Sequence, residues 1–137
     1  MDLKYAMIAD AINESREGKL NIAGAFESLG AFQFPATHPS MSIVAAFRVR
    51  PIDVGKRRVV TIRLLTSDGI EMMHADLPVQ IPSSPLGDAP TSVHAVGNLN
   101  GLRFEDPGDY AFSIEVDGHA VGSVPLTLIK ATLPKKP

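Results

Sequence analysis

The chain contains no cysteine and no tryptophan, and only 6% of its residues are aromatic. The absence of cysteine excludes disulfide bonds, thiol catalysis and thiolate metal ligands. The few aromatic residues provide little surface for stacking against bases. We therefore expect a fold that is held together by its hydrophobic core alone.

The chain also lacks a large excess of charge of one sign. Lysine and arginine total 13, aspartate and glutamate total 15, and the formal net charge is -2. This balance gives no general electrostatic reason to bind nucleic acid or an anionic membrane. Residues 1–6 carry charges where a signal peptide requires an apolar core, and no apolar run approaches membrane-spanning length. We expect a soluble, cytoplasmic protein that binds neither nucleic acid nor membrane.

Hydrophobic residues make up 45% of the 137 residues and charged residues 20%, as in an ordinary globular domain. A chain of this length buries enough surface to fold as one unit. We expect residues 1–132 to form a single domain. Residues 133–137 are expected to be a flexible tail, because chain ends without anchoring contacts are poorly ordered.

Apolar residues recur at every second position in several segments, which is typical of β-strands. In the first segment, Leu3, Tyr5, Met7 and Ala9 are expected to share one face. Turn-forming residues separate the segments at the following places: residues 13–18, 51–55, 66–69, 98–101 and 117–118. The pattern predicts an all-β fold, an antiparallel immunoglobulin-like β-sandwich of about seven or eight strands, without a disulfide.

Two proline-containing segments are expected to be connections rather than strands. Residues 31–40 contain Pro35 and Pro39, and residues 78–90 contain four prolines. Proline removes a backbone donor and so interrupts regular pairing. We expect extended loops in both places.

The segment from Asp106 through Gly108 to Tyr110 matches the tyrosine corner of immunoglobulin-like domains. In that motif a tyrosine near the start of a late strand directs its hydroxyl to upstream backbone. We interpret these three residues as structural, and we expect Tyr110, Phe112, Ile114 and Val116 to face the core. The alternative is a tyrosine that contacts a ligand.

One region of the chain concentrates basic residues. They are Arg48, Arg50, Lys56, Arg57, Arg58 and Arg63. Such a strip could meet an acidic partner surface or a phosphate backbone, whereas basic residues on exposed strands also serve to prevent edge pairing. His38, between two prolines, is the other candidate for recognition, and the alternative is a loop histidine that bonds local backbone.

The residues that usually carry chemistry are scattered. The four histidines show no zinc-ligand spacing, and Ser123 lacks the second glycine of a nucleophile elbow. A calcium site is a further alternative, and its ligands would be Asp53, Glu105, Asp106, Asp109 and Asp117. We predict no catalytic residue, no metal and no cofactor.

Four segments together resemble a family of short, uncharacterised bacterial proteins. They are Lys4 to Asp10, Gly18 to Phe26 (GKLNIAGAF), Phe34 to Pro39 (FPATHP) and Pro107 to Phe112 (PGDYAF). The resemblance covers nearly the whole chain. It implies a small stand-alone β domain and offers no catalytic residues to carry over to this chain.

The leading hypothesis is a non-enzymatic macromolecular interaction or assembly module whose partner is another protein or a second copy of itself. An alternative is a small-ligand or carbohydrate-binding domain that uses the 32–39 and 78–90 loops. A third hypothesis is an enzyme with a site around His38 or His94, which would require one of these histidines to meet a carboxylate in a cleft.

Overall fold

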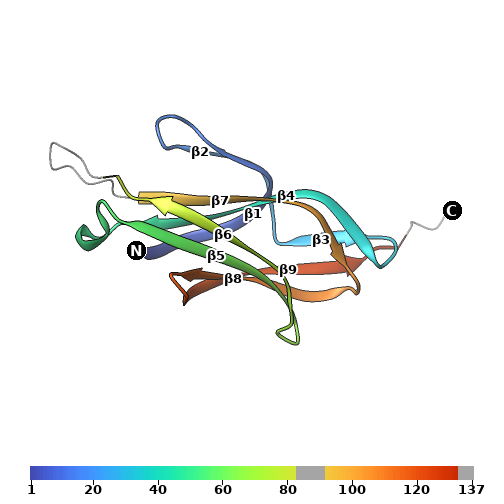
Figure 1. Ribbon diagram of the computed structural model, residues 1–137. Coiled ribbons are helices and arrows are strands. Elements are labelled where there is room, and N and C mark those ends of the chain that lie inside the picture. Colours follow the sequence, from blue (N-terminus) through green and yellow to red (C-terminus); the bar gives the residue numbers. More distant parts are fainter. Residues whose placement is uncertain (83–91, 133–137) are drawn as a thin grey trace.

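The computed structural model describes residues 1–82 and 92–132, and these residues form an all-β fold of two sheets (Figure 1). The strands are β1 (Asp2–Glu14), β2 (Leu20–Phe26), β3 (Ser28–Ala31), β4 (Ala36–Arg48), β5 (Arg57–Thr66), β6 (Glu71–Gln80), β7 (Ser92–Phe104), β8 (Gly108–Val116) and β9 (His119–Lys130). A single 3₁₀ turn, η1 (Pro51–Asp53), precedes β5. The predicted fold class is therefore confirmed at the level of an all-β, two-sheet structure.

The first sheet has the strand order β2-β1-β4-β7, and the second has the order β3-β9-β8-β5-β6. The short strand β3 pairs parallel with β9, and the other ladders are antiparallel. Three hairpins follow the turns expected from the sequence: β1–β2, β5–β6 and β8–β9. The last of them turns at Asp117 and Gly118, which both have positive φ, as a tight hairpin turn requires.

The core lies between the two sheets and is made by side chains at alternate positions. The first sheet contributes Ile43 and Phe47, and the second contributes Phe112 and Ile114, all of them fully buried. Tyr110 is 8% exposed and lies in the same core as these residues. The expected inward face of the strand from Tyr110 to Val116 is therefore confirmed.

Tyr110 also makes a hydrogen bond that fixes the start of β8. Its hydroxyl donates to the backbone carbonyl oxygen of Asp106 at 2.6 Å, which is the contact that defines a tyrosine corner. Its ring packs edge-on against Phe104, with 5.1 Å between the ring centroids. Gly108 has φ +137, a conformation that glycine adopts without steric cost.

The expectation that Leu3, Tyr5, Met7 and Ala9 share one face of β1 is wrong. The register between β1 and β4 shifts between Leu3 and Tyr5. A β-bulge inserts one residue, so side chains on its two sides point to opposite faces. Leu3 packs against the core, whereas Met7 and Ala9 belong to a separate apolar cluster.

The segment from Ala31 to Ser40 is not a loop over its whole length, because β4 begins at Ala36. Thr37 and His38 pair with Arg103 and Leu102 of β7. His38 is half-buried, and its ring centroid lies 6.2 Å from that of Phe26. The predicted loop histidine is thus a strand residue.

Part of the second expected loop is also a strand. Pro78 pairs with Val59, and β6 continues to Gln80. Residues 83–90 of that predicted loop and the predicted tail 133–137 lie outside the described residues.

Candidate functional site

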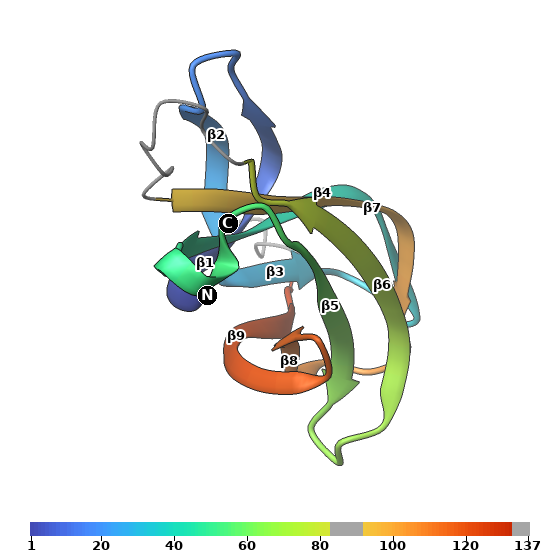
Figure 2. The ribbon, with the colours of Figure 1, turned by 60° about the vertical axis from the view of Figure 1, so that its left-hand side comes forward.

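The hairpin formed by β1 and β2 leaves the first sheet partway along β1. Pairing between β1 and β4 ends at Ala9, and beyond that point β1 pairs only with β2. Figure 2 shows this hairpin rising out of the sheet. We call residues 10–24 the arm.

Gly24 marks the base of the arm opposite Asp10. It has φ +69, and a Cβ placed there would lie 2.9 Å from Cγ of Asp10. Only glycine combines this backbone conformation with that close approach at low cost. Residue order alone does not reveal Asp10 as the neighbour that makes glycine necessary here.

The base of the arm is anchored by a small apolar cluster on the outer face of the first sheet. Ile12 is 6% exposed and packs with Ala9 of β1 and Val44 of β4. Leu20 and Val96 complete the contact. At about 25 cal/mol per Å² of apolar area, burial of Ile12 stabilises this arrangement by roughly 2 kcal/mol.

Glu14 connects the arm to β7. Its Oε2 lies 3.3 Å from Nδ1 of His94, whose side chain is 11% exposed. The contact lacks hydrogen-bond geometry, so the buried Nδ1 has no hydrogen-bond partner within the described residues. Both residues line a cleft of about 460 Å³ together with Asn13, Asn98 and part of β6. The structure therefore places His94 next to a carboxylate in a cleft and leaves His38 outside it.

β2 is exposed along most of its length. Asn21, Ile22, Ala23, Gly24 and Ala25 are all exposed, and Ile22 is 37% exposed. β2 lies at the edge of its sheet and pairs only with β1. An isolated two-stranded ribbon is marginally stable in water. The strand conformation of most of β2 therefore depends on its hydrogen bonds to β1.

The direction of the unpaired backbone groups of β2 follows from the turn of the arm. The N–H of Ser15 donates to the carbonyl oxygen of Lys19 at 2.8 Å, so these residues form a hydrogen-bonded pair. Hydrogen-bonded and non-hydrogen-bonded pairs alternate along an antiparallel ladder. The N–H and C=O groups of Leu20 and Ile22 therefore point away from β1, toward the free edge.

The edges of β6, β9 and β7 are obstructed or covered. In β6, Pro78 lacks a donor and the register shifts between Leu64 and Leu65 of the facing strand. In β9 the N–H of Thr127 points to the β3 side. Because backbone groups two residues apart point the same way, Pro125 leaves that edge without a donor. β7 lies against β6. β2 contains neither proline nor a charged residue.

Three arginines of the predicted basic strip are paired with carboxylates. Arg50 pairs with Asp2, with 3.0 Å from its Nε to Oδ2. Arg63 contacts both Glu71 and Glu115, at 2.5 and 2.6 Å. These arginines therefore serve as partners for carboxylates of the same chain, a role that the sequence alone did not reveal.

Arg58 belongs to a buried charge cluster around Asp53. Asp53 accepts hydrogen bonds from the Met1 ammonium at 2.9 Å, from Arg58 at 2.9 Å and from the backbone N–H of Arg50 at 3.0 Å. Burial favours the neutral acid, but these donors outweigh it and lower the pKa of Asp53 to about 2. Arg58 also contacts Asp117 at 3.3 Å. The cluster joins η1, β5 and the β8–β9 turn.

Among the described residues, no carboxylate lies within ion-pair distance of Arg48, Lys56 or Arg57. These three residues are the unpaired part of the basic strip.

The carboxylates considered for calcium are far from forming one site, because Asp109 lies at the start of β8 and Asp117 follows its end. Over residues 1–82 and 92–132, no group of three or more histidine or acidic side chains is placed to hold a metal ion. No helix in these ranges has the length and apolarity to cross a membrane.

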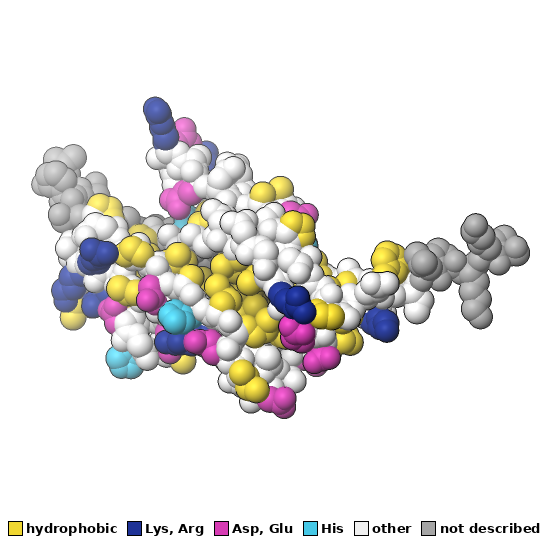
Figure 3. All heavy atoms as spheres, turned by 45° about the vertical axis from the view of Figure 1, so that its right-hand side comes forward, with side chains coloured by type: hydrophobic (Ala, Val, Ile, Leu, Met, Phe, Trp, Pro, Cys, Tyr) yellow, Lys and Arg dark blue, Asp and Glu magenta, His cyan; other side chains and the backbone are white. Residues whose placement is uncertain are grey.

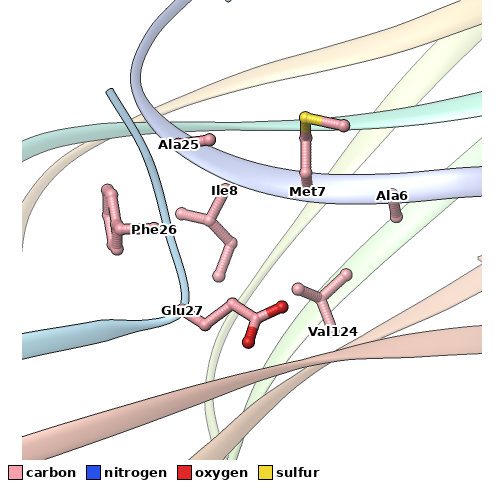
Figure 4. Close-up of a pocket in the computed structure, with 7 residues that line it drawn as sticks. All are labelled: Ala6, Met7, Ile8, Ala25, Phe26, Glu27 and Val124. Carbon is pink, nitrogen blue, oxygen red and sulfur yellow. The ribbon is translucent and has the colours of Figure 1, made fainter. Parts of the chain in front are cut away.

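A second hollow lies where the chain passes from β2 to β3. It has a volume of about 410 Å³ and is lined by Ala6, Met7, Ile8, Ala25, Phe26, Glu27 and Val124. Figure 4 shows the Glu27 side chain extending toward Val124, with Ile8 and Phe26 nearby. The side chains that line it are apolar apart from this carboxylate.

Comparison with known proteins identifies a family and a weak structural likeness. A family model described as "Family of unknown function (DUF6941)" matches residues 4–129. No curated protein matches the chain. The structure resembles part of the Pseudomonas fluorescens alkylpurine DNA glycosylase AlkC bound to DNA containing an abasic site analog, with a TM-score of 0.45 and 16% identity. The likeness covers 74% of this chain and 27% of that one.

Proposed function

The chain belongs to the DUF6941 family of unknown function, and we propose that it is a non-enzymatic macromolecular interaction or assembly module that binds through the free edge of β2. The observation that carries this proposal is the exposure of β2 from Asn21 to Ala25. A regular strand held by one ladder presents unpaired backbone donors and acceptors to any extended segment beside it.

The arm gives this edge access to a partner. In Figure 3 the arm is the projection at the upper left, with charged side chains at its end. The charges at the turn are Arg16, Glu17 and Lys19, whereas β2 itself is uncharged. The charged turn is well solvated, whereas the uncharged strand edge has no charge that would oppose pairing. These properties favour binding along β2 rather than through the turn.

The small net charge of the chain favours a protein partner over nucleic acid. The net charge is -2, and three arginines of the basic strip are neutralised by carboxylates. Nucleic-acid binding depends on an excess of free cations along one face. We infer a cytoplasmic bacterial protein whose partner is another protein or a second copy, with Arg48, Lys56, Arg57 and the half-buried His38 outside the main contact.

We also infer that the sandwich is immunoglobulin-like. The order β1-β4-β7 corresponds to strands A, B and E of that fold, and the order β9-β8-β5-β6 corresponds to G, F, C and C′. The hydrogen bond from Tyr110 to Asp106 lies in the strand that corresponds to F. On this assignment the arm is an insertion between strands A and B.

The proposed function is tested by capture from host lysate with three tagged baits: the wild type, Ile22→Lys and Ile70→Lys. Ile70 is a matched control, because it is an isoleucine that is 63% exposed at the β5–β6 turn. We expect a partner that the wild type and Ile70→Lys retain and that Ile22→Lys loses. Identical recovery with all three baits would exclude β2 as the binding edge.

A second candidate function is binding of a small ligand in the hollow of Figure 4. Its apolar lining and the single carboxylate of Glu27 favour an amphiphilic cation. For this candidate function the ligand binds in the hollow and not at the 32–39 and 78–90 loops suggested by the sequence. We expect a hydrophobic amine to raise the melting temperature of the wild type and not of Glu27→Gln. Equal shifts in both proteins would exclude this site.

A further inference from the structure

We propose that the partner of the β2 edge is β2 of a second copy of this chain, paired antiparallel about a two-fold axis at Ile22. The inference rests on the proposed function, because it names the occupant of the same edge. The pairing would join the first sheets of two protomers into one continuous sheet. Such a contact is isologous, with the same surface used by both copies.

The backbone of β2 is complementary to itself in this arrangement. The N–H and C=O of Ile22 both point to the free edge, as the alternation from Ser15 and Lys19 requires. A two-fold axis beside Ile22 brings its N–H opposite the C=O of the second Ile22, and the reverse. Leu20 supplies the next outward-facing groups on each side. The N–H and C=O of Ile22 gain partners without any change in the β1 ladder.

The side chains fit the same register. Leu20, Ile22 and Gly24 occupy alternate positions and so share one face of β2. The two Ile22 side chains become neighbours, and each Leu20 comes opposite Gly24 of the other copy, beside which the Asp10 side chain lies. Cross-strand apolar pairs stabilise a sheet, whereas like charges directly opposite each other destabilise it. β2 has no charged residue, so no like charges meet along it.

The described part of the molecule leaves room for this contact. The arm extends beyond the body in two views (Figures 2 and 3). At its tip Lys19 contacts Glu17 at 3.3 Å, so the turn carries charges of both signs toward the second copy. Residues 21–25 are exposed on both faces of β2, and Ile22, at 37% exposed, is the largest side chain among them.

The test uses the absence of native cysteine, which allows single cysteines to report on one position each. Ile22→Cys is compared with Ile70→Cys under mild oxidation at equal concentration. Hydrogen-bonded antiparallel partners have Cα atoms about 5.5 Å apart, within the range that a disulfide spans. We expect covalent dimer to form about tenfold faster or more at position 22, because pairing raises the effective concentration of the two thiols.

Sedimentation of the cysteine-free wild type, Ile22→Lys and Ile70→Lys completes the test. We expect a concentration-dependent dimer in the wild type and in Ile70→Lys, and a monomer in Ile22→Lys, with unchanged circular dichroism in all three. Equal crosslinking at positions 22 and 70, a wild type that stays monomeric up to about 100 µM, or a dimer that Ile22→Lys retains would each overturn the inference. If the wild type is monomeric while lysate capture still depends on Ile22, the proposed function stands and only the second copy as partner is wrong.

Discussion

Glu14 of the arm and His94 of β7 lie 3.3 Å apart, from Oε2 to Nδ1, and they connect the projecting hairpin to the body of the protein. The two residues are far apart in the sequence and on strands that do not pair with each other. Their contact and the apolar cluster around Ile12 are what hold the arm in its orientation.

Replacing Glu14 with alanine should loosen the arm without unfolding the protein. Glu14 is 39% exposed, so the global cost should be about 0–1 kcal/mol. Amide hydrogen exchange should become faster in residues 11–23 and stay unchanged in β5 and β8. Glu17→Ala, which removes an exposed carboxylate at the tip, is the control. Unchanged exchange in the arm would mean that the apolar cluster alone holds it.

Tyr110→Phe should destabilise the protein by about 0.5–1.5 kcal/mol, because it removes the part-buried hydrogen bond to the carbonyl oxygen of Asp106. The ring and its contact with Phe104 would remain. Chemical denaturation measures the difference. Tyr5→Phe, at a tyrosine that is 40% exposed, should cost little. A midpoint for Tyr110→Phe equal to that of the wild type would show that the hydrogen bond contributes nothing.

Gly24→Ala should destabilise the protein through two separable effects, the positive φ and the close approach to Asp10. We expect a loss of about 1–3 kcal/mol. Asp10→Ala combined with Gly24→Ala should recover the part caused by the side-chain contact. Gly69→Ala is the control, because Gly69 has φ +80 with open space around it. If Gly24→Ala costs no more than Gly69→Ala, the contact with Asp10 is unimportant.

Asp53 should make stability depend on pH in the acid range. Its pKa falls from the ordinary 3.8 to about 2 in the folded protein, so the folded state favours the ionised form. This contribution is fully present above the unfolded pKa and is lost as the pH falls from about 4 through about 2. The difference corresponds to about 2 kcal/mol.

The measurement is urea denaturation at several pH values between neutrality and pH 2, with wild type and Asp53→Asn. The variant should be less stable at neutral pH and should lack the part of the acid dependence that Asp53 supplies. Asp68→Asn, in the exposed β5–β6 turn, should behave as the wild type does. Parallel pH profiles for Asp53→Asn and wild type would contradict the role assigned to the charge cluster.

Much of the secondary structure was predictable because strand periodicity and turn chemistry are local. The alternation from Tyr110 to Val116 placed the inward residues correctly, and Asp117 and Gly118 form the expected turn. The errors also have local causes. Proline marked residues 31–40 as a loop, yet Pro39 is accommodated in β4, because an edge or irregular ladder position requires no donor.

The candidate site was not predictable in the same way. The periodicity of residues 3–9 is interrupted by a bulge that the residue types do not reveal. Nothing in the order of residues shows that β1 leaves β4 after Ala9, or that Glu14 then meets His94. These features depend on which segments lie against each other once the sheets have packed.

The sequence by itself determined an all-β chain, its hairpin turns, the corner at Tyr110 and the absence of thiol chemistry, since each depends on residue type and short-range spacing. The tertiary structure alone decided which charges are neutralised and which edge stays free. Arg58 and Asp117 are 59 positions apart and still form a pair, while β2, only a turn away from β1, keeps one side unpaired. Long-range packing chooses the partners of charged side chains and strand edges, because their energies depend on distance and burial rather than on order along the chain.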